Sequence, residues 1–93
     1  MPRFRNRPVD VVVDVRTKLE FWLGHLEGAV HIPVDTLAER LSEHPELTPD
    51  RRVMVYCASG ARSAAAARVL KERGFSHVVD GGAMAVAHSE YAA

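Results

Sequence analysis

Short apolar runs alternate along the chain with segments that have helical spacing. The run Val9–Val15 is rich in β-branched residues and too short for an ordinary helix, so it predicts a buried strand. Strands are predicted in the same way at Ala29–Ile32, Val53–Tyr56 and His77–Asp80. Strands that alternate with helices indicate an α/β fold with a mostly parallel sheet.

Helix signals separate these runs. Thr17 and Glu20 form a capping-box pattern and Gly24 offers a stop, which predicts a two-turn helix. An apolar stripe with the spacing i, i+3, i+4, i+7 predicts a second helix of about ten residues. Its members are Val34, Leu37, Ala38 and Leu41.

The strongest helix signal is Ala64–Arg73, which begins with four consecutive alanines. Gly74 suits the left-handed position after this helix, and Phe75 can then fold back onto Leu70 as in a Schellman motif. A weaker C-terminal helix is expected after Gly81-Gly82.

A chain of 93 residues predicts one domain, 1–93, because two cores would leave too few residues for either. Residues 1–8 hold three arginines and are expected to form a loose, solvated lead-in. Residues 88–93 are expected to be the frayed end of a helix.

Charge and cysteine content exclude several classes of protein. Twelve Lys and Arg balance twelve Asp and Glu, so no overall field favours nucleic acid or an anionic membrane. No apolar run is long enough to cross a bilayer, and we expect a cytoplasmic protein without nucleic-acid or membrane partners. One cysteine excludes an internal disulfide, and the five histidines lack metal-ligand spacing, so no metal or cofactor is expected.

The candidate chemistry lies at Cys57, where a predicted strand meets the strongest predicted helix. The small residues that follow (Ala58, Ser59, Gly60 and Ala61) allow a tight loop whose backbone N–H groups point inward. Such a loop lies at the positive end of a helix dipole and forms an anion nest. Together with Arg62, it should lower the pKa of the Cys57 thiol. The alternative interpretation is a tight turn with an inert buried thiol.

Other polar residues have structural and functional interpretations. Asp14 and Arg16 follow the first strand, where they either brace the loop or shape its anion pocket. The structural interpretation, with Asp14 accepting backbone N–H bonds and Arg16 pairing with Glu20 on the surface, is preferred. On the first helix, Leu19 and Leu23 are expected to be buried. Trp22 is then either an exposed contact residue or a packing residue, and packing is preferred. His25 is expected to make a fixed hydrogen bond in the turn after the helix.

Four ordered motifs between about Val11 and Ala85 resemble those of rhodanese domains. The motifs are Asp14-Val15-Arg16, Glu20-Phe21 with the segment Gly24–Pro33, Val55–Cys57 with the loop through Arg62 and Ser63, and the glycine turns Gly74-Phe75 and Gly81-Gly82. The resemblance implies a rhodanese-like α/β fold with helices on both faces of a central sheet of five strands, or of four in this shortened chain.

The resemblance also implies a sulfurtransferase activity. Cys57 would take a sulfane sulfur from thiosulfate or a persulfide, carry it as a persulfide, and pass it to cyanide or a thiol. The backbone amides of Ala58–Ser63 would hold the outer sulfur, and Arg62 would assist with the anionic donor. A single cysteine suffices because the acceptor supplies the second nucleophile.

Two alternatives stay open. One is a non-catalytic module of the same fold that binds a partner or senses a sulfur species. The other is a phosphatase or arsenate reductase of that fold, but these relatives use a C-x5-R loop, whereas Cys57 and Arg62 form C-x4-R.

The ends of the chain depart from the rhodanese pattern. Only about eight residues precede the first predicted strand, where the family has a strand and a helix, and Ala85-Val86 stand where an aromatic residue is common. Uncovered sheet edges favour association, so we expect a weak homodimer.

Overall fold

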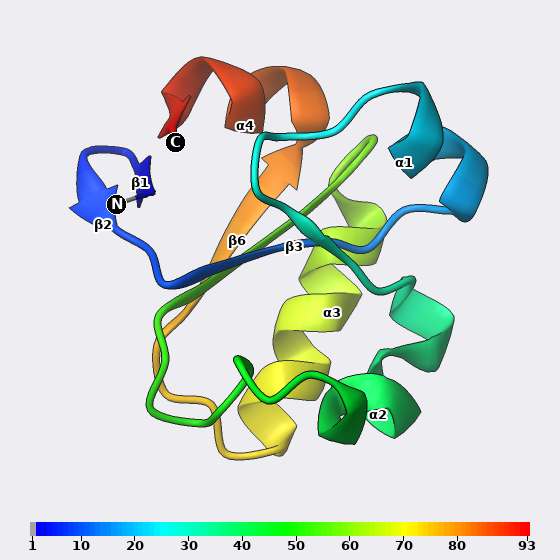
Figure 1. The fold of residues 1–93 in the computed structure, drawn as a ribbon, viewed down its shortest axis with the longest axis vertical. Helices are drawn as coiled ribbons and strands as arrows, with labels where there is room; N and C mark the ends of the chain where they lie inside the picture. The colour runs from blue at the N-terminus through cyan, green and yellow to red at the C-terminus, as the bar shows by residue number, and fades with distance from the viewer. Residues whose placement is uncertain (1) are drawn as a thin grey trace.

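A four-stranded parallel sheet forms the centre of the computed structural model, which describes residues 2–93. The order is β4-β3-β5-β6, and every neighbouring pair in it is parallel. The strands are β3 (Val11–Asp14), β4 (Val30–His31), β5 (Val53–Cys57) and β6 (Val78–Ala83). The α/β fold is therefore confirmed, with four strands rather than five (Figure 1).

Helices connect these strands and cover both faces of the sheet. They are α1 (Lys18–Leu23), α2 (Leu37–Arg40), α3 (Ala61–Glu72) and α4 (Met84–Glu90). The predicted ten-residue helix after Pro33 is instead divided, because 3-10 turns η1 (Val34–Thr36) and η2 (Leu41–Glu43) flank the single turn of α2. The predicted end of α3 is confirmed: Gly74 has φ +90°, and the Phe75 N–H donates to the Leu70 carbonyl at 3.0 Å.

Side chains of the two central strands alternate between two buried layers. Val53, Val55 and Cys57 belong to the layer under α2 and α3, together with Leu37 and Leu70. The opposite layer, beneath α4, is built from Phe4, Val9, Val12, Leu26, Met54, Tyr56 and Ala87. Because successive residues of a strand face opposite sides, Tyr56 and Cys57 lie back to back at the end of β5.

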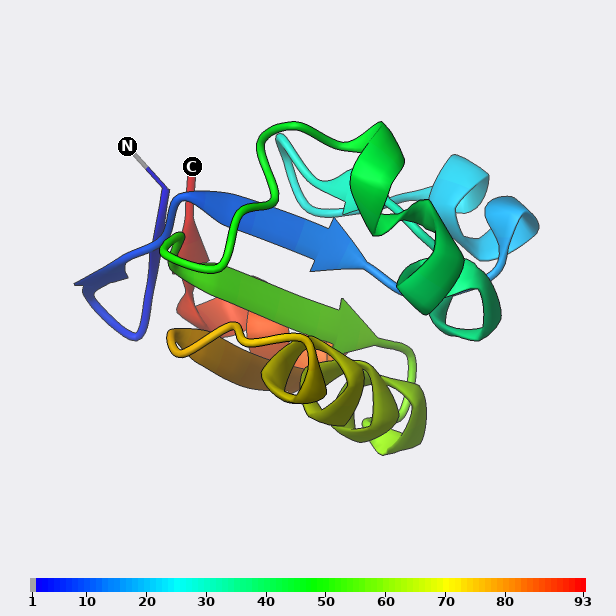
Figure 2. The ribbon, with the colours of Figure 1, turned by 90° about the horizontal axis from the view of Figure 1, so that it is seen from below.

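The two ends of the chain are ordered, which corrects the expectation of a loose lead-in and a frayed helix end. Strands β1 (Arg3–Phe4), β2 (Arg7–Pro8) and β7 (Tyr91–Ala92) form a small antiparallel sheet in which β1 pairs with β7, drawn dark blue and red in Figure 2. Phe4 is the apolar anchor of this sheet, since only 2% of its surface is exposed. The Tyr91 hydroxyl also donates to the Glu27 carbonyl at 2.5 Å.

Within residues 2–93 no helix combines the length and the apolar character that a bilayer crossing requires.

Candidate active site

Cys57 is the last residue of β5, at the carboxyl edge of the parallel sheet. The short loop Ala58–Gly60 follows it, and α3 begins at Ala61. The Cys57 side chain has no exposed surface and points toward α3. A strand that ends directly beneath a helix N-terminus exposes the cysteine sulfur to the unpaired N–H groups of the first helical turn.

The loop curls around the sulfur through a left-handed residue. Gly60 has φ +105°, a conformation that costs other residues free energy. In this position its N–H donates to Cys57 Sγ at 2.9 Å. The buried Ser63 hydroxyl donates to the Gly60 carbonyl at 3.0 Å and so ties the loop to the first turn of α3. Of the predicted loop residues, Gly60 thus contacts the sulfur directly, and Ser63 holds Gly60 in place.

The polar groups of the loop and of the first turn of α3 stabilise the Cys57 thiolate. Burial raises the pKa of the Cys57 thiol, but the neighbouring Ser63 hydroxyl and the backbone N–H groups of Ser63, Gly60 and Ser59 outweigh burial. The net effect lowers the pKa of Cys57 from its ordinary value. Cys57 is therefore suited to act as a nucleophile without a separate general base.

Arg62 lies at the rim of the loop and is held by α1. Its two terminal nitrogens donate to the two carboxylate oxygens of Glu20, at 2.6 and 2.9 Å. This bidentate pairing, with the Thr17 backbone N–H as a further donor, lowers the pKa of Glu20 to about 2. Glu20 also completes the predicted capping box with Thr17, which is confirmed. The expected pairing of Glu20 with Arg16 is wrong, because Glu20 binds Arg62.

Asp14 and Arg16 form a buried pair behind the loop, which corrects the expectation of a pair at the surface. The Arg16 side chain donates to both carboxylate oxygens of Asp14 at 2.7–3.0 Å, and Asp14 has no exposed surface. The Arg16 backbone N–H donates to the same carboxylate at 2.9 Å, as expected of a structural Asp14. A further Arg16 donor reaches the Gly24 carbonyl at 2.6 Å.

Tyr56 completes this buried network and was not among the residues predicted for the site. Its hydroxyl donates to Asp14 Oδ2 at 2.7 Å and accepts from the Leu26 backbone N–H at 3.0 Å. Burial, followed by the neighbouring Asp14 carboxylate, raises the pKa of Tyr56, so the hydroxyl stays protonated and able to donate. The network therefore fixes the turn after α1 against the strand that carries Cys57.

Helix α1 has none of the buried side chains that the sequence predicts for it. Leu19, Trp22 and Leu23 are 64%, 79% and 72% exposed, so the expected packing of all three is wrong. The opposite side of the helix is anchored by Phe21, whose ring stacks on that of His25 with centroids 3.7 Å apart. His25 makes the expected fixed hydrogen bond, because its Nδ1 lies 2.8 Å from the Phe21 carbonyl.

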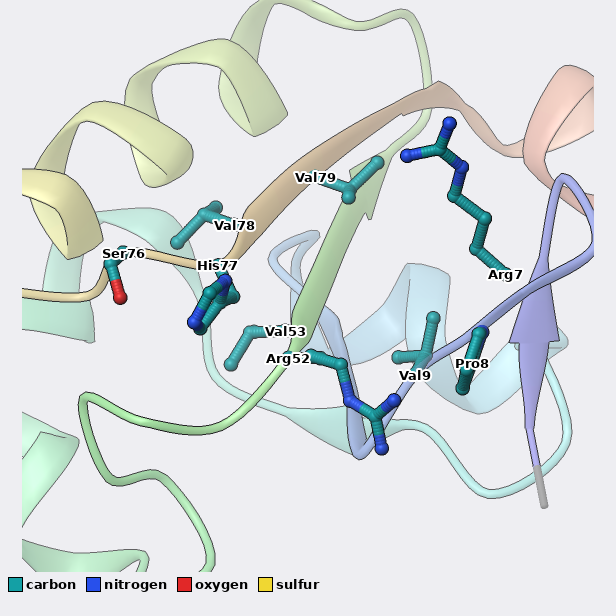
Figure 3. A pocket seen from close by; sticks show the side chains of 9 residues that line it. All are labelled: Arg7, Pro8, Val9, Arg52, Val53, Ser76, His77, Val78 and Val79. Atoms are coloured by element: carbon teal, nitrogen blue, oxygen red, sulfur yellow. The ribbon is translucent and has the colours of Figure 1, made fainter.

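A cavity of about 310 Å³ lies away from Cys57, at the amino ends of β5 and β6 (Figure 3). Apolar side chains including Val9, Val53 and Val79 line it, with Arg7 and Arg52 at its edge. Arg52 is already paired with Asp10, at 2.9 Å. No group of three or more side chains able to hold a metal ion occurs in the part of the chain that the structure describes.

Known proteins share this fold and this sequence pattern. The family model for the rhodanese-like domain matches residues 3–89. A rhodanese from E. coli, solved with anions, superposes with a TM-score of 0.77 at 28% identity, covering 88% of this chain and 95% of that one. A rhodanese-like domain protein from Staphylococcus aureus gives a TM-score of 0.72 at 32% identity, covering 86% and 74% of the two chains.

Longer proteins also contain a region similar to this chain. A tRNA uridine(34) hydroxylase of Citrobacter koseri is 35% identical over 80 residues. The match covers 81% of this chain but only 23% of that relative's length. On the family match over residues 3–89, with these solved structures in support, the chain belongs to the rhodanese-like domain family.

Proposed function

We propose that this domain is a sulfurtransferase that moves a sulfane sulfur from a donor such as thiosulfate to a thiol or cyanide through a persulfide on Cys57. The observation that carries the proposal is the contact between the Gly60 N–H and Cys57 Sγ at 2.9 Å, inside a loop at the N-terminus of a twelve-residue helix. The same donors that favour the thiolate would also favour the negative outer sulfur of a persulfide.

In the loading step the Cys57 thiolate attacks the outer sulfur of thiosulfate. A new S–S bond forms to Cys57, the S–S bond of thiosulfate breaks, and its electron pair leaves with sulfite. The total charge is unchanged, and the persulfide retains one negative charge on its outer sulfur. The loop amides from Ala58 to Ser63 would hold this charge, and Arg62, whose guanidinium is paired with Glu20, would assist at the rim.

In the unloading step an acceptor attacks the outer sulfur. Cyanide bonds to this sulfur and departs as thiocyanate, whereas an acceptor thiolate becomes a new persulfide. In both cases the S–S bond to Cys57 breaks and its electron pair returns to Cys57 Sγ. No proton needs to be transferred by the protein, because both the attacking group and the leaving group are anions. In agreement with this, no histidine or carboxylate within residues 2–93 forms a hydrogen bond with Cys57 Sγ.

The alternatives with the same fold are less well supported. A phosphatase or arsenate reductase must enclose a tetrahedral oxyanion, and the C-x4-R loop is one residue shorter than the loop used for that purpose. A non-catalytic module does not require a lowered pKa at Cys57, which the loop donors nevertheless produce.

The curated relatives suggest a second candidate, a domain that works within a larger tRNA-hydroxylating protein. The observation in its favour is the 35% identity over 80 residues. The balanced charge gives this domain no general attraction for RNA, so sulfur transfer by its own residues is the better-supported function.

A turnover assay tests the proposal. With thiosulfate and cyanide as substrates, the parent protein should release thiocyanate catalytically, and Cys57→Ser should release none. A phosphate ester should not be hydrolysed. Folded parent protein that forms no thiocyanate, or hydrolysis of the ester that depends on Cys57, would refute the proposal.

A further inference from the structure

The outward face of α1, formed by Leu19, Trp22 and Leu23, is an exposed apolar surface on the helix whose Glu20 binds Arg62 of the Cys57 loop. The three side chains have the spacing i, i+3 and i+4, so they share one side of the helix. Exposed fractions of 64%, 79% and 72% leave all three largely in contact with water. An apolar helical stripe ordinarily faces the core of its own domain, so this orientation needs another explanation.

The inner side of α1 is held by specific contacts, so the helix cannot simply rotate to bury its apolar face. Glu20 forms the bidentate pair with Arg62, and the Phe21 ring stacks between His25 and His31, with centroids 3.7 and 4.7 Å away. The capping box and the Gly24 N–H, which donates to the Phe21 carbonyl at 3.2 Å, fix both ends. The apolar face is therefore an ordered part of the surface.

The helix that carries this face also contacts the site. From its inner side the Glu20 carboxylate binds the guanidinium of Arg62 at the rim of the Cys57 loop. A molecule seated on the outward face of α1 would therefore lie about one helix diameter, roughly 10 Å, from that rim. Because Cys57 has no exposed surface, a large acceptor needs such a guide to bring its thiol to the persulfide.

Area and charge indicate what kind of molecule this face fits. Three mostly exposed side chains of this size present on the order of 400 Å² of apolar surface. A stable interface needs roughly 800 Å² from each partner, so the face suits a transient encounter better than a permanent dimer. Lys18, Leu19 and Trp22 line a hollow of about 410 Å³. Lys18 has no carboxylate partner within residues 2–93, whereas Glu20 is neutralised by Arg62.

We infer that the outward face of α1 docks the sulfur acceptor, and that this acceptor is a polypeptide segment with an apolar side chain and a carboxylate next to its cysteine. The apolar side chain enters the hollow at Trp22, and the carboxylate pairs with Lys18. The inference rests on the proposed function. The acceptor thiolate attacks the outer sulfur of the Cys57 persulfide, a new persulfide forms on the acceptor, and the electron pair of the broken bond returns to Cys57.

The experiment compares acceptors and variants after loading with thiosulfate. One probe is a short synthetic peptide whose single cysteine is flanked by phenylalanine and aspartate, and the second is the same peptide with serine at both flanking positions. Sulfur transfer to each peptide and to cyanide is followed for the parent, Trp22→Ala and Val86→Ala. Val86 is a control because it is also exposed, at 48%, but lies on α4.

The parent should transfer sulfur to the phenylalanine–aspartate peptide about tenfold faster than to the serine peptide, as expected for one aromatic anchor. Trp22→Ala should abolish this advantage and leave transfer to cyanide unchanged, while Val86→Ala should retain it. Equal rates with both peptides, or an advantage that survives in Trp22→Ala, would overturn the inference.

A binding measurement separates failure of docking from failure of the chemistry. Trp22 is the only tryptophan, so its fluorescence reports on the face directly. A peptide with serine in place of cysteine should change this fluorescence even in Cys57→Ser, where no persulfide can form. No change would overturn the inference independently of the proposed function. Dimerisation or binding to anionic lipid vesicles that is lost in Trp22→Ala, without peptide binding, would assign the face to a second copy or a membrane instead.

Discussion

The guanidinium of Arg62 is bound by both carboxylate oxygens of Glu20, at 2.6 and 2.9 Å. This ion pair joins the first turn of α3, which follows the Cys57 loop, to the first turn of α1. It also neutralises Arg62, so the lowered pKa of Cys57 depends mainly on the surrounding hydrogen-bond donors. The positive charge available to an anionic donor is accordingly set by Glu20.

Glu20→Gln should lower the free energy of unfolding by about 1 kcal/mol at neutral pH, because one-third exposed ion pairs are partly screened by solvent. The pKa of Glu20 is lowered to about 2 in the folded protein, from 4.5. Its contribution is therefore fully present above about pH 4.5 and lost as the pH falls toward 2. Urea unfolding of the parent and Glu20→Gln at pH 7 and near pH 2.5 measures this contribution.

The two proteins should differ at pH 7 and converge near pH 2.5. A difference that stays constant over this range would show that the carboxylate charge contributes nothing. Lys71→Gln, on the exposed surface of α3 away from Glu20, serves as the control for a simple change of charge.

Ser63→Ala should raise the pKa of Cys57, because it removes the hydroxyl that lowers this pKa and that also ties the loop to the first turn of α3 through the Gly60 carbonyl. The rate of alkylation by iodoacetamide, measured against pH, gives this pKa directly. In the folded parent the midpoint should lie below that of the urea-unfolded protein, and in Ser63→Ala it should shift upward. Identical midpoints for folded and unfolded parent would refute the account of the loop.

Tyr56→Phe should destabilise the fold by about 1–3 kcal/mol, because it leaves the buried Leu26 N–H without its acceptor and removes one of the donors to Asp14 Oδ2. The substitution preserves the ring, which belongs to the same buried layer as Met54 and Ala87. Chemical unfolding gives the stability change, and alkylation tests whether the Cys57 pKa stays the same. A neutral substitution would indicate that the buried network does not hold the α1 turn in place.

Gly60→Ala and Gly81→Ala should separate effects on the site from effects on the fold. At Gly60 a Cβ would make only an ordinary contact, 3.9 Å from the Ala83 backbone nitrogen, but the φ of +105° is strained, so the loop should shift away from Sγ and sulfur transfer should fall at least tenfold. At Gly81 a Cβ would lie 2.6 Å from Met54 Sδ, so stability should fall by about 1–3 kcal/mol.

In Gly81→Ala the remaining folded protein should still show the lowered Cys57 pKa. If instead Gly60→Ala transfers sulfur as fast as the parent, the left-handed conformation of the loop is not required for catalysis.

Much of the fold follows from local patterns. The capping box of Thr17 and Glu20 and the Schellman end of α3 at Gly74 are both present, because each depends on residues only a few positions apart. The β-branched runs likewise give the parallel strands. The ordered termini could not be predicted in this way, because β1 and β7 are two-residue strands that pair across almost the whole chain.

The site shows the same division. The donors around Cys57 come from the short segment 59–63 and were predicted from its small side chains and Gly60. The pairs Arg62–Glu20 and Tyr56–Asp14 join residues that are 42 positions apart, so they depend on the strand register that places Asp14 opposite Tyr56. Packing was preferred for Trp22, and burial was expected for Leu19 and Leu23, because the spacing of an apolar stripe does not reveal which side of a short helix faces the core.

The intact mass of the purified protein, recorded before and after incubation with thiosulfate, tests the central claim most directly. The parent should gain the mass of one sulfur atom, the gain should be reversed by cyanide, and Cys57→Ser should gain nothing. No gain in folded parent protein whose thiol can still be alkylated would contradict the account and favour a module that only binds.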